Sequence, residues 1–269
     1  MDLQLLKLDN DLKFKSFENL LTKSIAGLEG KVLKNGKLDY HKQEFLKQYL
    51  SHFISIKTLA SGLKLIYKNH EHEISALAPV CVLIRAGLEN YSMFYYIYRA
   101  SSKHEDIYFK FWSWYREGLM YRRRLRVNGH EETLKDDEQE IERIFNGLSR
   151  HPMYDSLSLK QKNNYLKYGT WCIPSKRKLL ELSGFPLVLS QNLYNHFSSY
   201  THPTSSSQLT TSQADFQMSN SILNTMLNTI FICSGFYLHH YSILFEDIKR
   251  LMTQNEISLI ESWCKLVNS

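Results

Sequence analysis

The sequence is poor in the residues that interrupt helices. It contains 11 Gly and 5 Pro among 269 residues. Both residues weaken or break helices, and the apolar positions of this chain mostly recur at the spacing of helical turns, which favours helices throughout. We therefore predict an all-α protein, a single bundle of roughly seven to nine helices.

Cysteine is also scarce, and the four cysteines are widely spaced: Cys81, Cys172, Cys233 and Cys264. This spacing fits neither a disulfide framework nor a zinc site, and reduced thiols are typical of a cytoplasmic protein. His70 and His72 cannot share one face of a helix, and no third ligand is close in sequence. We predict no bound metal and no cofactor.

Several familiar catalytic motifs are missing. The stretch GLEGKVLKNGK at residues 27–37 fits neither the Walker nor the Rossmann glycine spacing. The chain contains no G-x-S-x-G nucleophile elbow and no H-E-x-x-H zinc motif. P-loop nucleotide hydrolysis, nicotinamide chemistry and zinc-dependent hydrolysis are therefore not expected.

No long uncharged apolar run is evident. The N-terminal stretch MDLQLLKLDNDLKFKS carries charges every few residues and lacks the apolar centre of a signal peptide. Arg85 interrupts one apolar stretch, and Asn224 and Asn228 polarise another. We expect a cytoplasmic protein with no membrane partner. Its net charge of +6 is compatible with a polyanionic partner but does not require one.

The apolar segment 76–100, ALAPVCVLIRAGLENYSMFYYIYRA, carries a polar stripe. At about 100° per residue in a helix, one face collects Arg85, Glu89, Ser92, Tyr96 and Arg99. A charge buried in such a helix must be paired or hydrogen-bonded. The stripe is either a functional cleft or an internal Arg85–Glu89 ion pair that fixes the packing register.

A second polar segment, YNHFSSYTH, spans residues 194–202. Tyr194, Ser198 and Thr201 share one helical face, and His202 lies at its edge. Histidine can act as a general base or acid, and arginine can hold a phosphate with two hydrogen bonds. Together these groups are sufficient for RNA cleavage through the 2′-hydroxyl without a metal.

A further helix is predicted over residues 103–127, and its C-terminal end is rich in arginine, including Arg122 and Arg123. Aromatic residues interleaved with arginines can stack on bases and neutralise phosphates. The alternative, which we favour, is that these arginines complement the helix C-terminus and the acidic stretch at residues 131–142.

The remaining elements are expected as follows. Helices are predicted over residues 2–30, 42–69, 215–245 and 256–267, with HEHE at residues 70–73 as a turn. Asn35-Gly36 predicts one small β-hairpin near residues 32–40. We expect one domain over residues 1–269, with an N-terminal extension at 1–40 packed on a core at 76–245.

The R-x-x-x-E of Arg85 and Glu89, followed by the Tyr-x-x-x-Ser-x-x-x-His of Tyr194, Ser198 and His202, resembles an uncharacterised bacterial family of all-helical proteins. That family is itself distantly similar to the HEPN superfamily, named for higher eukaryotes and prokaryotes nucleotide binding. The resemblance covers residues 40–245 in layout and five positions in motif.

HEPN proteins are dimeric helical bundles, many of them metal-independent ribonucleases of antiviral defence and toxin systems, with a signature of Arg, four to six residues, then His. Arg99-Ala-Ser-Ser-Lys-His104 matches this spacing, although Ala100 stands where such enzymes usually carry a polar residue. The resemblance implies RNA or a nucleotide as ligand, a homodimer, and a protein partner in a defence or toxin system.

Our leading hypothesis assigns roles on this basis. Arg85 or Arg99 would hold the phosphate, His202 or His104 would move the proton, and Glu89 would orient the arginine. The expected substrate contacts are Tyr194, Ser198, Tyr96, Arg122 and Arg123. Two alternatives remain, namely a non-catalytic interaction protein with a structural polar network, and a sensor that binds a small anion through Arg85 and Arg99.

Overall fold

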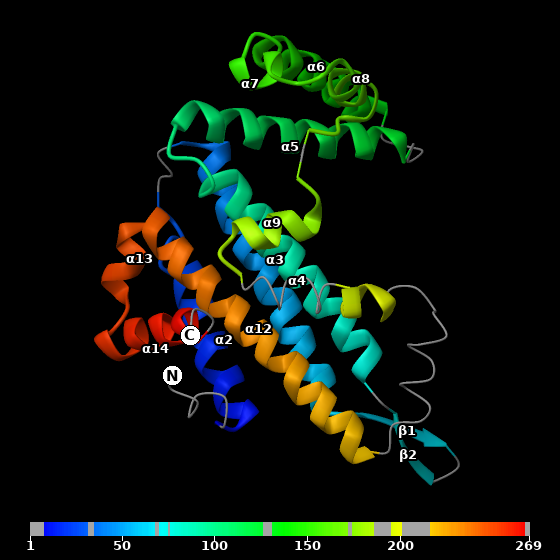
Figure 1. The fold of residues 1–269 in the computed structure, drawn as a ribbon, viewed down its shortest axis with the longest axis vertical. Helices are drawn as coiled ribbons and strands as arrows, with labels where there is room; N and C mark the ends of the chain where they lie inside the picture. The colour runs from blue at the N-terminus through cyan, green and yellow to red at the C-terminus, as the bar shows by residue number, and fades with distance from the viewer. Residues whose placement is uncertain are drawn as a thin grey trace. The chain divides into compact units, whose positions relative to one another are not determined.

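The predicted all-α class is confirmed by the computed structural model (Figure 1). The structure describes residues 8–31, 35–67, 70–74, 76–125, 131–171, 174–185, 195–200 and 216–266. Within these ranges, all regular structure is helical except one two-stranded antiparallel hairpin. Very short helices, such as α7 (Pro152–Asp155) and α13 (Glu246–Leu251), bring the number of helices above the seven to nine predicted.

The chain forms two compact units. The first unit consists of Met1–Phe94 and Lys176–Ser269, and the second of Tyr95–Ser175. The predicted N-terminal extension at residues 1–40 and core at residues 76–245 stay predictions.

The first unit is built on long helices that share an aromatic core. Its described helices include α2 (Asn10–Ala26), α3 (Lys37–Ala60), the greater part of α4 (Leu77–Tyr98), α9 (Lys176–Leu182), α12 (Phe216–Leu244), α13 and α14 (Gln254–Lys265). The Phe14 and Phe231 rings lie 4.8 Å apart between centroids, and Phe17 and Trp263 lie 5.7 Å apart. Such edge-to-face pairs add to the apolar burial that joins α2, α12 and α14.

Helix α12 is long and strongly apolar. Its segment Ser221–Leu244 is long and apolar enough to cross a membrane, but 67% of its most apolar window is buried inside the protein. A helix at the centre of a helical bundle is apolar on most sides for the same reason. The prediction of no membrane partner therefore stays a prediction.

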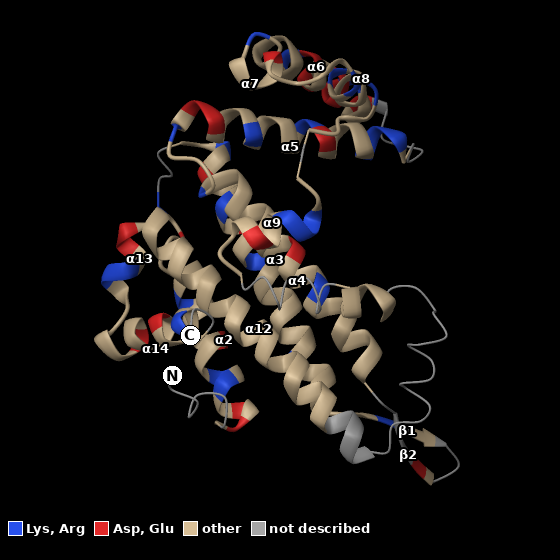
Figure 2. Ribbon diagram, viewed as in Figure 1, with Lys and Arg blue, Asp and Glu red and all other residues tan. Residues whose placement is uncertain are grey.

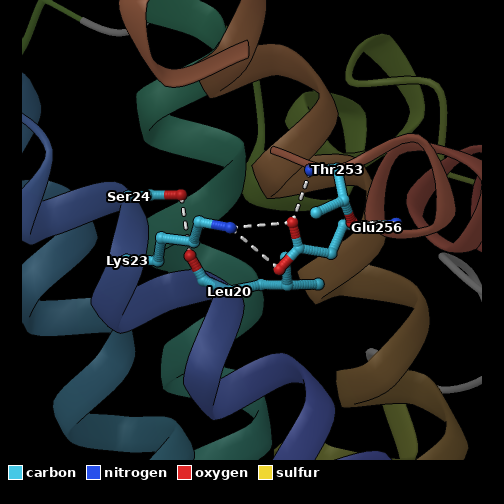
Figure 3. A network of polar contacts seen from close by, with 5 residues as sticks. All are labelled: Leu20, Lys23, Ser24, Thr253 and Glu256. Atoms are coloured by element: carbon cyan, nitrogen blue, oxygen red, sulfur yellow. Dashed lines mark hydrogen bonds and ion pairs between the residues drawn. The ribbon is translucent and has the colours of Figure 1, made fainter. Parts of the chain in front are cut away.

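Figure 3 shows how the start of α14 is fixed on α2. Lys23 Nζ lies 3.1 and 2.8 Å from the two carboxylate oxygens of Glu256. Glu256 Oε2 also accepts the backbone N–H of Thr253 at 2.7 Å, and Thr253 Oγ1 accepts the N–H of Glu256 at 3.3 Å. This is a capping box, and it satisfies two of the N–H groups that a helix start leaves without partners.

The predicted hairpin near residues 32–40 is wrong. Residues 32–34 lie outside the described part, and Lys37 already begins α3. Gly36 has φ +51°, and the Asn35 N–H is accepted by Asp39 Oδ2 at 3.0 Å. The Asn-Gly pair therefore starts a helix, because the left-handed conformation open to glycine serves a helix entry as well as a hairpin turn.

The hairpin that does form lies at residues 63–74, where we predicted the end of a helix and a turn. Strand β1 (Leu63–Tyr67) pairs with β2 (His70–Ile74), with Leu63 opposite Ile74. The predicted helix over residues 42–69 is thus wrong after Ala60, where α3 ends before Gly62, whose φ is +101°.

Over its described residues, the second unit contains the last turn of α4 and four further helices. These are α5 (His104–Arg124), α6 (Glu131–Leu148), α7 and α8 (Leu159–Tyr168). The amphipathic helix α6 packs its apolar face on α5 through Phe109, Leu119, Ile141, Ile144 and Leu148. The predicted helices over residues 76–100, 103–127 and 215–245 are confirmed as α4, α5 and α12 over the described residues.

Candidate functional site

The ion pair predicted in the polar stripe of α4 is present. Arg85 Nε donates to Glu89 Oε1 at 3.0 Å, and the two side chains are 20% and 24% exposed. Lys176, the first residue of α9, contacts the other carboxylate oxygen of Glu89. The Glu89 carboxylate therefore pairs with two cations: Arg85 of its own helix and Lys176, which is 87 residues away in sequence.

The start of α9 carries two further cations after Lys176. Arg177 and Lys178 both pair with Glu181, at 3.7 and 2.9 Å. All three basic side chains at the start of α9 are more than half exposed. Arg85 is thus already engaged by Glu89, and the more exposed positive charge here belongs to α9.

The other members of the α4 stripe point to packing. Ser92 is buried, and its hydroxyl donates to the backbone carbonyl of Glu89 at 3.0 Å. The Tyr96 ring is 9% exposed, stacks on Trp171 at 5.6 Å, and has Lys110 Nζ 4.5 Å from its centroid. A substrate could reach Tyr96 only after one of these neighbours moved, so its predicted substrate contact has no support from this arrangement.

The corner between α4 and α5 holds Arg99 and His104. The backbone N–H groups of Arg99 and Ala100 donate to the Tyr95 carbonyl at 2.7 and 2.9 Å, which closes the end of α4. Ser101 Oγ donates to Asp106 Oδ2 at 2.7 Å and accepts the Lys103 N–H at 3.3 Å. The corner is therefore fixed by its own short-range hydrogen bonds.

Neither Arg99 nor His104 has a side-chain partner within the described part of the chain. Arg99 Nε is buried and has no hydrogen-bond partner there. His104 is exposed and begins α5. The two side chains lie in the second unit, five positions apart, and neither is held in an ion pair by the described residues.

Arg122 and Arg123 pair with the acidic helix α6. Arg122 Nε donates to Asp137 Oδ2 at 2.7 Å, and Arg123 Nε lies 3.6 Å from Glu138 Oε1. Hydrogen bonding by Asp137 raises the pKa of the Arg122 guanidinium against the effect of its slight burial. This is the arrangement that the sequence favoured, and it neutralises part of the charge that substrate binding would use.

The second polar segment lies mostly outside the described residues. Tyr194 and His202 are not described, so the expected pairing of Arg85 with His202 stays a prediction. Ser198 lies in a helical stretch over residues 195–200 and is half-buried. Two further matches to the Arg–His spacing, Arg123 and Arg124 with His130, were missed by the sequence analysis, and His130 is also undescribed.

One buried polar set was not found from the sequence. Tyr91 Oη lies 2.9 Å from the Ser183 carbonyl oxygen, to which it donates, and 3.1 Å from His240 Nδ1. The Tyr91 and His240 rings are stacked at 6.1 Å between centroids. Tyr91 lies one residue before Ser92 of the polar stripe, and His240 follows a long apolar run. Neither local pattern marks the two residues as a pair, because only the tertiary fold brings them together.

The described residues offer little for metal or thiol chemistry. Among them there is no group of three His, Cys, Asp or Glu side chains that could hold a metal ion. Burial raises the pKa of the Cys81 and Cys233 thiols to about 12. Because the thiolate is the reactive form, neither cysteine is a nucleophile near neutral pH.

No protein-family model, curated protein or solved structure matches this chain.

Proposed function

We propose that the protein binds RNA or a nucleotide and cleaves RNA without a metal at the corner between α4 and α5. The observation that carries this proposal is the state of Arg99 and His104. Both lack side-chain partners among the described residues, whereas Arg85, Arg122 and Arg123 are each paired with a carboxylate. A phosphate oxygen is a suitable partner for a buried guanidinium nitrogen that has none.

The chemistry follows from what these two side chains can do. Arg99 would hold the phosphate and stabilise the charge that develops on its oxygens. The His104 imidazole would accept the proton of the 2′-hydroxyl as its oxygen bonds to phosphorus. The bond from phosphorus to the 5′-oxygen breaks, and the protonated His104 imidazole gives its proton to that oxygen. The products are a 2′,3′-cyclic phosphate and a 5′-hydroxyl, and no metal takes part.

The wider role rests on the resemblance to HEPN proteins. Their Arg–His spacing is met at Arg99 and His104, and the all-α fold is compatible with theirs. We accordingly propose a cytoplasmic homodimer with a role in bacterial antiviral defence or as a toxin, and with a protein partner in that system.

A second candidate function is that of a non-catalytic interaction or anion-sensing protein. The observation that favours it is the pairing of Glu89 with both Arg85 and Lys176. On this proposal the polar stripe fixes helix packing, and the exposed cations at the start of α9 attract a small anion. Thermal stabilisation by inorganic phosphate or a nucleotide, without turnover, would favour this candidate.

The test is incubation of the purified protein with total bacterial RNA in EDTA. We expect fragments that end in 2′,3′-cyclic phosphates from the wild type and none from His104→Ala or Arg99→Ala. His70→Ala is the matched control, because His70 is an exposed histidine in strand β2. Circular dichroism checks that every variant is folded.

The outcomes separate the candidate residues. Cleavage that survives His104→Ala but is lost in His202→Ala would move the site to Arg85 and His202. Loss only in His130→Ala would move it to Arg123 or Arg124. Absence of cleavage by the wild type would overturn the catalytic part of the proposal and favour the second candidate.

A further inference from the structure

The C-terminal ends of α5 and α8 meet in the second unit. Arg124 Nη2 donates to the Tyr168 carbonyl at 3.2 Å, and Arg124 Nε donates to the Met120 carbonyl at 3.3 Å. One residue beyond α8, Gly169 lies against the α5 backbone, where a Cβ atom would come 3.0 Å from Glu117 Cα. The two helix ends therefore form one continuous surface.

This surface exposes three large side chains, two of them aromatic. Tyr121 is 60% exposed, Leu125 57% and Tyr168 42%. Lys167 Nζ lies 5.1 Å from the centroid of the Tyr168 ring, and Arg124 is exposed beside them. We name the five residues the α5–α8 patch: Tyr121, Arg124, Leu125, Lys167 and Tyr168.

The cations of the α5–α8 patch have no carboxylate partner within the described residues. Within the described residues, the Arg124 guanidinium donates only to backbone carbonyls, and Lys167 has only the Tyr168 side chain as a partner. By contrast, Arg122, Arg123 and Arg143 are each paired with a carboxylate of α6. Helix α8, LKQKNNYLKY, contains three lysines and no acidic residue.

Figure 2 shows Lys and Arg gathered at the C-terminal end of α5. Cations at this position also complement the negative end of a helix dipole. That role would not require exposed aromatic rings beside them. The combination of exposed rings with cations that lack carboxylate partners is typical of surfaces on which unpaired bases stack while phosphates meet positive charge.

We propose that the α5–α8 patch binds single-stranded RNA and holds the substrate of the reaction proposed at Arg99 and His104. This inference rests on the proposed function, since it assigns RNA as the ligand. Tyr168 and Tyr121 stack on bases, and Lys167 and Arg124 contact phosphates. Helix α5 places His104 and Arg124 about 30 Å apart, at about 1.5 Å per residue. An oligonucleotide can therefore contact the patch while it is held at His104, whereas a dinucleotide is too short to do so.

The test measures binding separately from cleavage. A fluorescein-labelled single-stranded RNA of 12 nucleotides is titrated in EDTA with full-length His104→Ala protein, and the fluorescence polarisation of the RNA is measured. The His104→Ala substitution keeps the RNA from being cleaved during the titration. Added to this background, Tyr168→Ala and Lys167→Ala are each expected to raise the Kd about tenfold. Arg143→Ala is the matched control, because it removes a paired cation from the same unit, and its Kd should change less than twofold.

Three results would overturn the inference: no binding of the 12-nucleotide RNA, equal binding of all variants, or equal loss in Arg143→Ala. Tight binding of the same RNA as a duplex would also contradict it, because stacking requires unpaired bases. Circular dichroism of Tyr168→Ala excludes loss of fold, and Tyr168→Phe should bind as the parent does, since it keeps the ring.

The two proposals fail separately. Patch-dependent binding by a wild type that does not cleave RNA would overturn the catalytic proposal and support the α5–α8 patch. Cleavage of both a dinucleotide and a long RNA that is unaffected by Lys167→Ala and Tyr168→Ala would overturn the patch and leave the catalytic proposal in place. Loss of long-RNA cleavage with unchanged dinucleotide cleavage supports both.

Discussion

The Asp39 carboxylate lies 2.7 Å from the Lys42 ammonium group, and both side chains are buried in the first turns of α3. Asp39 also accepts the backbone N–H of Asn35 at 3.0 Å. Burial by itself raises the pKa of Asp39, but hydrogen bonds from Lys42 and Asn35 outweigh it, and the net pKa is lower than the ordinary 3.8. The buried pair therefore depends on an ionised carboxylate.

This pair predicts a loss of stability in acid. Because the folded pKa of Asp39 is depressed, its contribution is present above about pH 4, near the unfolded value. It is lost as the pH falls through the lower folded value. The urea midpoint of the wild type should fall below pH 4, and Asp39→Asn should weaken that dependence. Glu246→Gln is the control, because Glu246 is 77% exposed in its pair with Arg250. An unchanged pH profile in Asp39→Asn would contradict the prediction.

The same turn shows why a local sequence signal can predict the wrong element. Asn35-Gly36 is compatible with a hairpin and with a helix entry, since both use a glycine of positive φ. What decides between them is Asp39, which accepts the Asn35 N–H and pairs with Lys42. That interaction is specified by side-chain geometry and not by the alternation of polar and apolar residues.

The candidate site was predictable where its contacts are local. The Arg85–Glu89 pair follows from i,i+4 spacing on a long periodic helix, and α4 itself begins and ends within two residues of the predicted bounds. The contact of Lys176 with Glu89 could not be predicted, since it depends on how α9 packs. The Tyr91–His240 contact joins residues 149 positions apart and has no signal in either local pattern.

The Glu89 carboxylate provides a second prediction. Glu89→Gln removes the charge that both Arg85 and Lys176 contact. The side chains of the Arg85–Glu89 pair are about three-quarters buried or more, so we expect a loss of about 1–3 kcal/mol in the free energy of unfolding. The matched control is Glu246→Gln, where loss of an exposed pair should cost less than about 0.5 kcal/mol. Equal urea midpoints for the two variants would count against a structural role for Glu89.

The capping box at α14 provides a third prediction. Thr253→Ala removes the oxygen that accepts the Glu256 N–H, so stability should fall by about 1 kcal/mol. Thr58→Ala is the control, because Thr58 is exposed within α3 and only donates back to the Ile54 carbonyl. Alanine is the better helix former there, so that variant should be neutral or slightly more stable. Chemical denaturation of both variants measures the difference, and a Thr58→Ala loss as large as that of Thr253→Ala would refute the assignment.

Gly169 closes α8 against α5 and gives the last prediction. Its φ is +76°, and a Cβ atom would meet Glu117 Cα at 3.0 Å and Met120 Sδ at 3.1 Å. Gly30 has a similar φ of +72° but open space around it. Alanine at either position costs about 1–2 kcal/mol for the positive φ, but only at Gly169 must the α5 backbone also move. Gly169→Ala should therefore destabilise the protein more than Gly30→Ala.

Tryptophan fluorescence during urea unfolding suits this comparison, because three of the four tryptophans, Trp112, Trp114 and Trp171, lie in the second unit with Gly169. Gly169→Ala should lower the midpoint of the tryptophan signal more than Gly30→Ala does. If the two variants lower it equally, the contact between Gly169 and α5 contributes no more than the backbone conformation. Since this contact also joins the two halves of the α5–α8 patch, Gly169→Ala should weaken binding of single-stranded RNA even at urea concentrations where the protein remains folded.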